Sequence, residues 1–402
     1  MNRRRPLAPG WAPVALAVLL AGPLTESSAW ARVKLVTLPV RDRVEVHLEH
    51  ESATLVEEER VVPLVKGRNQ VDFSWANTRI DPNTIVFRVL GPAEGPAVRA
   101  RVLSVSYPPN EQALVWAVYA DRAGAARVRI SYLLGGLGRS YAYRAITSAD
   151  ERRLTLRRYL RLSNQANEGF GQANLHMADG RRVDTPIDIA QTRQILVDRH
   201  ANLPVVKTYT ADVARHGYLD PAEKKLRIPM HYVVRNDEDH GLGRAPLPAG
   251  KVRIFQTDSK GTQAFLGEDW GAATPVDDAM RLYLGVAQDI VVRRHIEKRR
   301  NRSVQGRLRH VEVVVRYEIE NFKSKKVRLD LVESVTALRN ELGLRGGLQS
   351  QLVIGKTASD ALTVDEARSG LQELVMSRTL PRRTSTAKKQ TVRLYLTFEN
   401  EW

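Results

Sequence analysis

The fold class is decided by the stretch Val311-Glu312-Val313-Val314-Val315-Arg316-Tyr317-Glu318-Ile319-Glu320. Apolar residues occupy every odd position, and all but one of the residues between them are charged. Successive side chains of a β-strand point to opposite faces of the sheet, so this period of two predicts a strand with one buried face and one solvated face.

The same alternation recurs along the chain, at 44–48 near its beginning and at 392–398 near its end. Turn residues separate the apolar runs, as in the segments 66–69, 108–110 and 248–250. Further candidate strands are 60–65, 84–90, 113–119, 127–134, 154–162, 226–234, 251–256, 281–285, 289–297 and 327–335. Many short strands at this spacing predict an all-β fold of tandem β-sandwich domains with little helix.

One segment leaves the choice between helix and strand open. Residues 364–376 have apolar positions that suit a short amphipathic helix, with Asp365 and Glu366 favourably placed near its start. The part from Leu371 to Met376 reads equally well as a strand. The preceding stretch 339–361 is rich in glycine and weakly patterned, and is interpreted as an excursion from the last domain.

The first 31 residues have the three parts of a secretory signal peptide. Arg3, Arg4 and Arg5 precede an apolar run, and Ala29-Trp30-Ala31 supplies small residues at a cleavage position. An uncleaved membrane anchor is the alternative, but the apolar run is short for a span of about 20 residues. We therefore expect an exported protein, periplasmic or extracellular, with no transmembrane segment after cleavage.

Composition shifts place the expected domain boundaries. After the leader we expect an N-terminal β domain over 32–106, a central β region over 107–202 and a C-terminal β-sandwich domain over 203–402. The chain has no cysteine, which excludes disulfides, thiolate metal sites, a cysteine nucleophile and a lipidated N-terminal cysteine.

The formal net charge is +17, which suits an anionic neighbour such as an envelope polysaccharide, a lipid headgroup layer or extracellular nucleic acid. An arginine-rich composition typical of a GC-rich genome explains the charge equally well and implies no partner.

The most conspicuous candidate site is a basic segment near 293–310. Between Val291 and His310 the chain has eight cations and Glu297 as its one acidic residue. The cations are Arg293, Arg294, Lys298, Arg299, Arg300, Arg302, Arg307 and Arg309. We interpret the segment as the tip of a hairpin that joins strands 289–297 and 311–319 and binds an anionic partner; a solvated loop is the alternative. No aromatic residue is interleaved to stack on bases, so a specific nucleic acid is not expected. Lys388, Lys389, Arg382 and Arg383 form a second, weaker patch.

No catalytic, metal or cofactor motif is convincing. The acidic turn 236–241 lacks the ligand spacing of an EF-hand loop and reads as an ordinary turn. His47 and His50, three apart in a strand, lie on opposite faces. Residues 385–388 match S-x-x-K without its companion motifs, and 355–357 resemble only the end of a phosphate loop. We predict no catalytic residue, no metal and no cofactor.

Several segments in order along the chain carry a family resemblance. The N-terminal ones are ATLVEEER (53–60), KGRN (66–69) and RIDPNT (79–84). The central ones are ISY (130–132), YAY (141–143) and LRLSN (160–164). The most specific is LPAGKVRIF (247–255), followed by LGED (266–269), LG (284–285) and DIVV (289–292). Together they resemble the mucoidy inhibitor A-like proteins, whose body is the domain of unknown function 4139.

The resemblance covers nearly all of the chain after the leader, with two departures. Leu137 and Phe170 stand where the family leads us to expect tryptophans, and the coiled coil of some members is absent. The resemblance implies β-sandwich domains and an envelope or secreted setting, and it supplies no catalytic residue. Two hypotheses follow: a non-enzymatic scaffold or binding module for an anionic envelope component, or a secreted hydrolase of envelope glycan or peptide whose carboxylates meet in a cleft.

Overall fold

The computed structural model describes residues 34–50, 53–94, 98–345, 350–355, 363–383 and 389–401. Strands hold 63% of the residues and helices 5%, in several mostly antiparallel sheets, so the prediction of an all-β fold with little helix is confirmed. The expected leader at 1–31 lies outside the described residues. Among the helices that the structure describes, none has the length and apolar character needed to cross a membrane.

The chain divides into two compact units that interleave in sequence. The first takes its described residues from the segment ending at Pro39, from Val61–Ser74 and from Val89–Arg127. The second consists of Val40–Arg60, Trp75–Arg88 and Val128–Trp402. Strands β3, β5 and β8 each contribute residues to both units.

Sheet 1 belongs to the first unit and has the strand order β1-β4-β7-β6. Its strands are β1 (Lys34–Thr37), β4 (Gly67–Ser74), β7 (Ala113–Ala120) and β6 (Ala100–Ser106). The pair β1–β4 is parallel and the other two pairs are antiparallel. Alternating residues of β4 and β7 are buried, and the rings of Phe73 and Trp116 lie 5.8 Å apart between centroids.

Sheet 2 has the strand order β12-β11-β2-β3-β8-β5. Its strands are β12 (Arg182–Ile187), β11 (Phe170–His176), β2 (Arg43–His47), β3 (Leu55–Leu64), β8 (Gly124–Leu133) and β5 (Val86–Glu94). The pairing of β2 with β11 is parallel and joins segments about 130 residues apart in the chain, ending at the pair His47 and His176.

Sheet 3 has the strand order β13-β10-β9-β18-β19. Its strands are β13 (Thr192–Pro204), β10 (Arg153–Asn164), β9 (Leu137–Thr147), β18 (Gly250–Thr257) and β19 (Gln263–Gly271). The parallel pairing of β9 with β18 begins opposite Gly250, where an added Cβ would lie 2.4 Å from the carbonyl oxygen of Tyr141. The close approach of the two backbones therefore requires glycine at this position.

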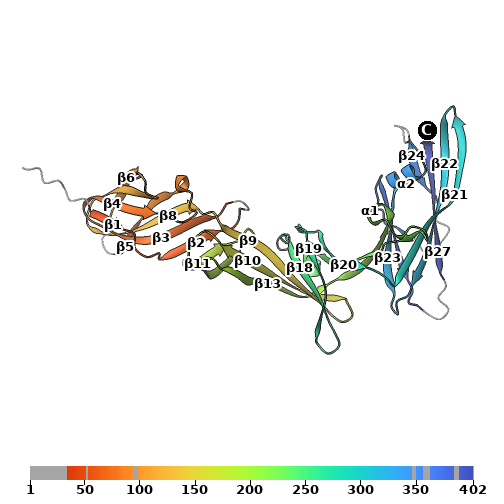
Figure 1. Cartoon of the computed structure of the whole chain (residues 1–402), viewed down its shortest axis with the longest axis horizontal. Helices are drawn as coiled ribbons and strands as arrows, with labels where there is room; N and C mark the ends of the chain where they lie inside the picture. The colour runs from red at the N-terminus through yellow and green to blue at the C-terminus, as the bar shows by residue number, and fades with distance from the viewer. Residues whose placement is uncertain are drawn as a thin grey trace, which may run out of the picture. The chain divides into compact units, whose positions relative to one another are not determined.

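Sheets 4 and 5 contain the remaining strands among the described residues (Figure 1). Sheet 4 consists of β20 (Ala279–Val286), β17 (Pro229–Arg235), β14 (Val206–Asp212), β23 (Val327–Ser334), β26 (Glu373–Leu380) and β25 (Thr363–Val364). Sheet 5 consists of β15 (Tyr218–Asp220), β16 (Lys225–Leu226), β21 (Ile290–Gln305), β22 (Leu308–Asn321), β27 (Gln390–Glu401) and β24 (Gln351–Ile354).

Two apolar clusters pack the described strands of sheets 3, 4 and 5 together. One lies between sheets 4 and 5, and its buried side chains include Tyr209, Leu329, Leu331, Met376, Val313, Val315, Leu394, Leu396 and Phe398. The alternating valines of the opening stretch face this cluster, as the period of two predicts. The other lies between sheet 3 and the β17–β20 side of sheet 4, and includes Tyr143, Leu154, Leu156, Val252, Ile254, Tyr232 and Leu282.

The expected domain boundaries differ from this arrangement. The boundary at 106/107 falls between β6 and β7, which pair along their length, and the boundary at 202/203 falls inside β13. Composition marks loops and turns, but it carries no information about which strands pair across them. The second apolar cluster likewise combines residues from both sides of position 202.

The helices within the described part of the chain are few and short. They are α1 (Val213–His216), α2 (Val335–Glu341) and the 3-10 turns η1 (Pro82–Thr84) and η2 (Glu238–His240). For residues 364–376, where helix and strand were both open, the helix is wrong. Residues 366–368 form a turn, and β26 begins at Glu373.

The predicted strand 327–335 ends one residue early, because Ser334 caps α2 by accepting a hydrogen bond from the Ala337 amide. The excursion over 339–361 includes the end of α2 and the edge strand β24.

Candidate functional site

The basic segment is almost entirely β-strand rather than a hairpin tip. β21 and β22 run side by side as long arrows in Figure 1, and the turn between them contains only Gly306 and Arg307. Gly306 has φ of 58°, a conformation that two-residue hairpin turns need and that glycine adopts without strain. The part of the β21–β22 hairpin nearest the turn extends beyond the apolar core, so the strands need no apolar face in that part. Hydrophobic periodicity therefore did not predict that both strands continue up to the turn.

Arg294 does not belong to the exposed site. Its guanidinium is buried and donates to both Glu333 oxygens at 2.7 and 2.9 Å and to Glu341 at 2.9 Å. The Tyr317 hydroxyl donates to the same Glu333 carboxylate. Burial acts to lower the pKa of Arg294, but the hydrogen bonds and charge of Glu333 outweigh it and raise that pKa above its usual value. Arg294 is therefore a structural cation between sheets 4 and 5.

Arg293 is also paired, with Glu320 at 3.0 Å and Glu223 at 3.1 Å. Arg309 is half-buried, and in the strand register it lies opposite Ser303 on one side and Glu401 on the other. The structure therefore removes three of the eight predicted cations from the freely exposed set, because carboxylates distant in sequence lie beside them.

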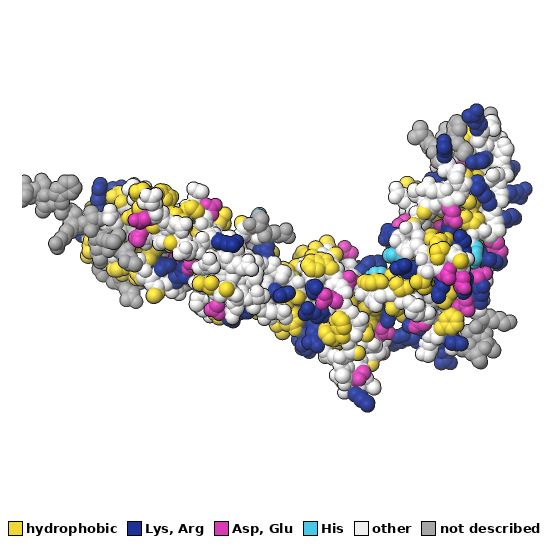
Figure 2. Space-filling model, viewed as in Figure 1, with side chains coloured by type: hydrophobic (Ala, Val, Ile, Leu, Met, Phe, Trp, Pro, Cys, Tyr) yellow, Lys and Arg dark blue, Asp and Glu magenta, His cyan; other side chains and the backbone are white. Residues whose placement is uncertain are grey.

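The five remaining cations are exposed and form no ion pair with any described carboxylate. They are Lys298, Arg299, Arg300, Arg302 and Arg307. Alternation puts Lys298, Arg300 and Arg302 on one face of the ribbon and Arg299 on the other. We call these five residues the basic ribbon; Figure 2 shows dark blue side chains along this end of the molecule.

Acidic residues near the basic ribbon compensate little of its charge. Glu297, just before it, is engaged by Arg393 at 2.5 and 3.0 Å, and the hydrogen bond from Arg393 lowers the pKa of Glu297. Glu312 lies opposite Arg300 in the register and is exposed without an ion pair within 4 Å among the described side chains. The ribbon therefore keeps a net positive charge.

The outer edge of β21 is largely open. β16 pairs with β21 only at Lys225 opposite Arg293. Beyond that point β22 is the single neighbour of β21 among the described strands. Exposed strand edges that carry Lys and Arg resist pairing with other chains, so the charges also protect this edge.

The second predicted patch is weaker still. Lys389 pairs with Glu318, and the Arg383 guanidinium lies 5.2 Å from the centre of the Phe322 ring. Arg382 is exposed, and Lys388 lies outside the described residues. The S-x-x-K motif at 385–388 and residues 356 and 357 of the phosphate-loop-like motif also lie outside them.

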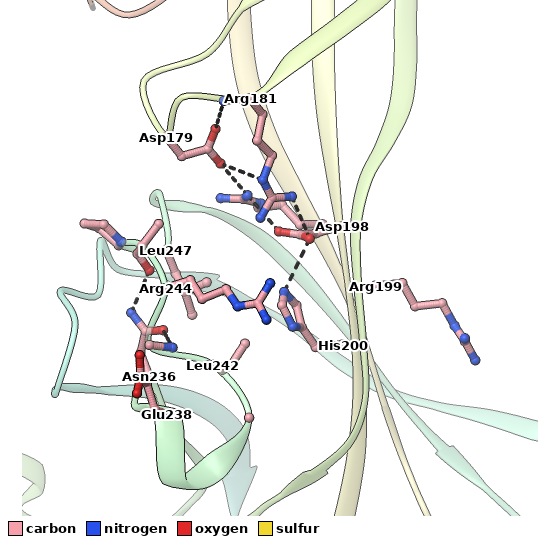
Figure 3. Close-up of a pocket in the computed structure, with 15 residues that line it drawn as sticks. Asp179, Arg181, Asp198, Arg199, His200, Asn236, Glu238, Leu242, Arg244 and Leu247 are labelled. Carbon is pink, nitrogen blue, oxygen red and sulfur yellow. Dashed lines mark hydrogen bonds and ion pairs between the residues drawn. The ribbon is translucent and has the colours of Figure 1, made fainter.

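A polar cavity of about 870 Å³ lies within the second unit (Figure 3). Its lining comes from β10, from the β11–β12 connection, from β13 and from the loop 236–247. Buried Arg158 donates to Asp179 at 2.6 Å and to Asp198 at 2.7 Å, and Arg181 contacts Asp198 at 2.6 Å. In Figure 3 the Arg244 guanidinium points toward the ring of His200.

The cavity's two convergent carboxylates are held as ion-pair partners. Burial acts to raise the pKa of Asp198, but hydrogen bonding from Arg181 and the charge of Arg158 outweigh it and lower that pKa. A carboxylate with a lowered pKa is a weak base and is not protonated at neutral pH, so it cannot serve as the general acid that hydrolysis needs. This cluster was not predictable from local sequence patterns, because its residues come from separate strands and one connection.

The acidic turn at 236–241 forms one wall of the cavity. The buried Asn236 amide donates to the carbonyls of Ala245, Thr274 and Pro275, and its oxygen accepts from the Gly243 amide at 3.0 Å. Asp237 accepts from Arg235 at 2.6 Å and from the His240 amide at 2.9 Å. These oxygens fix the turn itself.

No model of a protein family matches the chain, and no curated protein matches it in sequence.

Proposed function

We propose that this chain is an exported, non-enzymatic envelope protein that binds an anionic envelope polymer through the basic ribbon. The observation that carries the proposal is the set of five exposed cations on a two-stranded ribbon, none of which forms an ion pair with a described carboxylate. We further propose, from the resemblance in segments such as 247–255, that the chain is related to the mucoidy inhibitor A-like proteins.

The ribbon's geometry supports binding of an extended polymer. Cations on both faces can contact carboxylate, sulfate or phosphate groups spaced along a flexible chain. No aromatic side chain stands between Val291 and His310, so the contacts are to charged groups rather than to stacked rings. The affinity should therefore depend steeply on salt and little on polymer sequence.

The alternative function, a hydrolase that cleaves such a polymer, has less support from the geometry of the carboxylates. In the polar cavity, the two convergent carboxylates Asp179 and Asp198 are neutralised by Arg158 and Arg181. Hydrolysis of glycosidic bonds needs a carboxylic acid with a raised pKa beside an ionised partner.

The experiment measures binding of the full chain to heparin as a polyanion probe at several salt concentrations. The triple variant Arg299→Gln/Arg300→Gln/Arg302→Gln should bind more weakly, and the slope of log affinity against log salt should become shallower by about 2.1–2.7, because each lost contact removes about 0.7–0.9 from it.

A matched control removes the same charge elsewhere, at three exposed arginines that form no ion pair with a described residue: Arg68→Gln/Arg88→Gln/Arg161→Gln. This control should keep the wild-type slope. Equal effects of the two triple variants would mean that net charge alone, and not the ribbon, is responsible. If the ribbon variant binds heparin like the wild type but aggregates, the cations of the basic ribbon would instead serve to keep the open edge of β21 from pairing with other chains.

A further inference from the structure

Two histidines distant in sequence meet at the ends of neighbouring strands in sheet 2. His47 ends β2 and His176 ends β11, and the parallel register pairs them directly. Their rings are stacked, with centroids 4.4 Å apart and 12° between the planes. Both side chains are partly exposed, His47 at 24% and His176 at 15%.

Carboxylates surround this pair in a specific way. Nε2 of His176 contacts Glu45, and Nε2 of His47 lies 3.5 Å from Glu57 on β3. Each ring thus turns one nitrogen toward a carboxylate, which leaves Nδ1 for another partner. The Glu49 carboxylate lies 3.4 Å from Nδ1 of His47.

We propose that His47, His176 and Glu49 bind a divalent transition-metal ion of the zinc class. One ligand atom from each of the three residues lies within 4.8 Å of the others. Zinc–ligand bonds of about 2 Å in a tetrahedral site place ligand atoms about 3.3 Å apart. Small rotations of the two rings and of Glu49, whose side chain is 53% exposed, close that difference.

The chemistry of the ligands selects the class of metal. Two imidazoles and one carboxylate suit zinc, and they leave a fourth position open to water. Calcium and magnesium prefer sites built from oxygen ligands. Glu45 and Glu57 would act as outer partners that orient each imidazole, an arrangement common around histidine-bound metals.

Two arginines lie beside the outer carboxylates of the site and compensate their negative charge. Arg43 contacts Glu45, and Arg129 lies 3.6 Å from Glu57. Glu49 pairs with no described arginine or lysine, so the ligand set itself keeps a negative charge for a dication. The site lies in sheet 2 and shares no residue with the basic ribbon of sheet 5, so it stands independently of the proposed function.

Of the two histidines in the cluster, only His47 could be singled out from the sequence. The sequence pairs His47 with His50 by spacing, but β2 ends at His47 and His50 lies beyond the strand. The metal-ligating cluster among the described residues includes His176 and excludes His50. Only the parallel pairing of β2 with β11 brings the second imidazole to the site.

The test uses the full chain, stripped with a chelator and titrated with zinc chloride in a calorimeter. We expect saturable binding of one zinc ion per chain. His47→Gln and His176→Gln should each weaken binding at least tenfold, and Glu45→Gln should weaken it roughly tenfold through the lost outer partner. His50→Gln removes a neighbouring histidine outside the cluster and should bind zinc like the wild type.

A second readout guards against variants that fail to fold. Cobalt(II) bound to the wild type should give the visible absorption of a four-coordinate site, and Glu49→Gln, a change at an exposed side chain, should alter that spectrum. The proposal is overturned if the wild type shows no saturable binding, if His50→Gln loses affinity as much as His47→Gln, or if a folded His47→Gln chain binds zinc unchanged.

Discussion

Arg294 and Lys298 belong to the same basic run of the sequence, yet their environments are opposite. Arg294 is 2% exposed and is held by Glu333 from sheet 4, whereas Lys298 extends into solvent. The difference depends on a glutamate 39 residues away, so inspection of the run itself could not reveal it. A buried charge tolerates loss of its partner poorly, because the remaining charge is left without compensation.

Substitution of Arg294 by Met should therefore destabilise the fold by about 3–5 kcal/mol, because Glu333 stays buried without its partner. Urea denaturation measures this change. The double variant Arg294→Met/Glu333→Leu removes both charges and should recover much of the lost stability. A single variant as stable as the wild type, or a double variant no better than the single, would contradict the role assigned to this pair.

At the scale of single elements, periodicity carried most of the information. The alternation from Val311 to Ile319 correctly predicted β22 and its buried face. Periodicity underestimated the length of β21, because the basic half of this strand has no apolar face that would indicate a strand. The segment around Leu371 stayed ambiguous because short apolar runs fit both helix and strand, and only pairing of β26 with β23 decides between them.

The cavity and the histidine cluster were not predictable by the same means. Arg158, Asp179 and Asp198 meet through pairing between β10 and β13 and through the β11–β12 connection, and His47 meets His176 through a parallel pairing. Such contacts depend on sheet topology, which local pattern does not encode. The sequence therefore indicated where charge accumulates, but not which charges are paired.

Gly250 provides a test of one such pairing. Substitution by Ala places a methyl group 2.4 Å from the Tyr141 carbonyl oxygen and should force β18 away from β9, at a cost of about 1–3 kcal/mol. Thermal or urea unfolding measures the cost. Gly267→Ala on the adjacent strand β19 meets no atom within 4 Å and should change stability much less. Similar losses for the two variants would argue against the close contact.

At the scale of the whole molecule, sheets 3 and 4 are joined by more than apolar contacts. Glu151, between β9 and β10, accepts hydrogen bonds from Lys207 and Tyr232 of sheet 4, each at 2.6 Å, and also contacts Lys325. Burial acts to raise the pKa of Glu151, but these three donors outweigh it and lower that pKa to about 2. Position 202 therefore separates segments that share both an apolar cluster and an ion-pair network.

The lowered pKa gives a pH dependence with a definite sign. In the unfolded chain Glu151 takes up a proton near pH 4.5, whereas in the folded protein it does so near pH 2. Its contribution to stability is therefore complete above about pH 4.5 and is lost as the pH falls toward 2. Glu151→Gln should cost about 2 kcal/mol at pH 7 and should flatten the pH dependence of unfolding in that window.

Urea unfolding at pH 7, 4.5 and 3 measures this effect. Asp239→Asn, a change at an exposed acid with no described ion pair, is the matched control and should leave the profile unchanged. An identical pH profile for wild type and Glu151→Gln would rule out the assigned linkage.

The open edge of β21 has a consequence for how copies of this protein behave toward one another. Two such edges brought together would align like charges, so at low ionic strength the molecules repel at the place where backbone groups are free to pair. At 1 M salt the screening length falls to about 3 Å, and that repulsion disappears. If the protein binds a polyanion as we propose, the bound polymer would cancel the same charges locally. Saturating amounts of polymer would then remove the barrier to edge-to-edge assembly, and the protein would form clusters along the polymer.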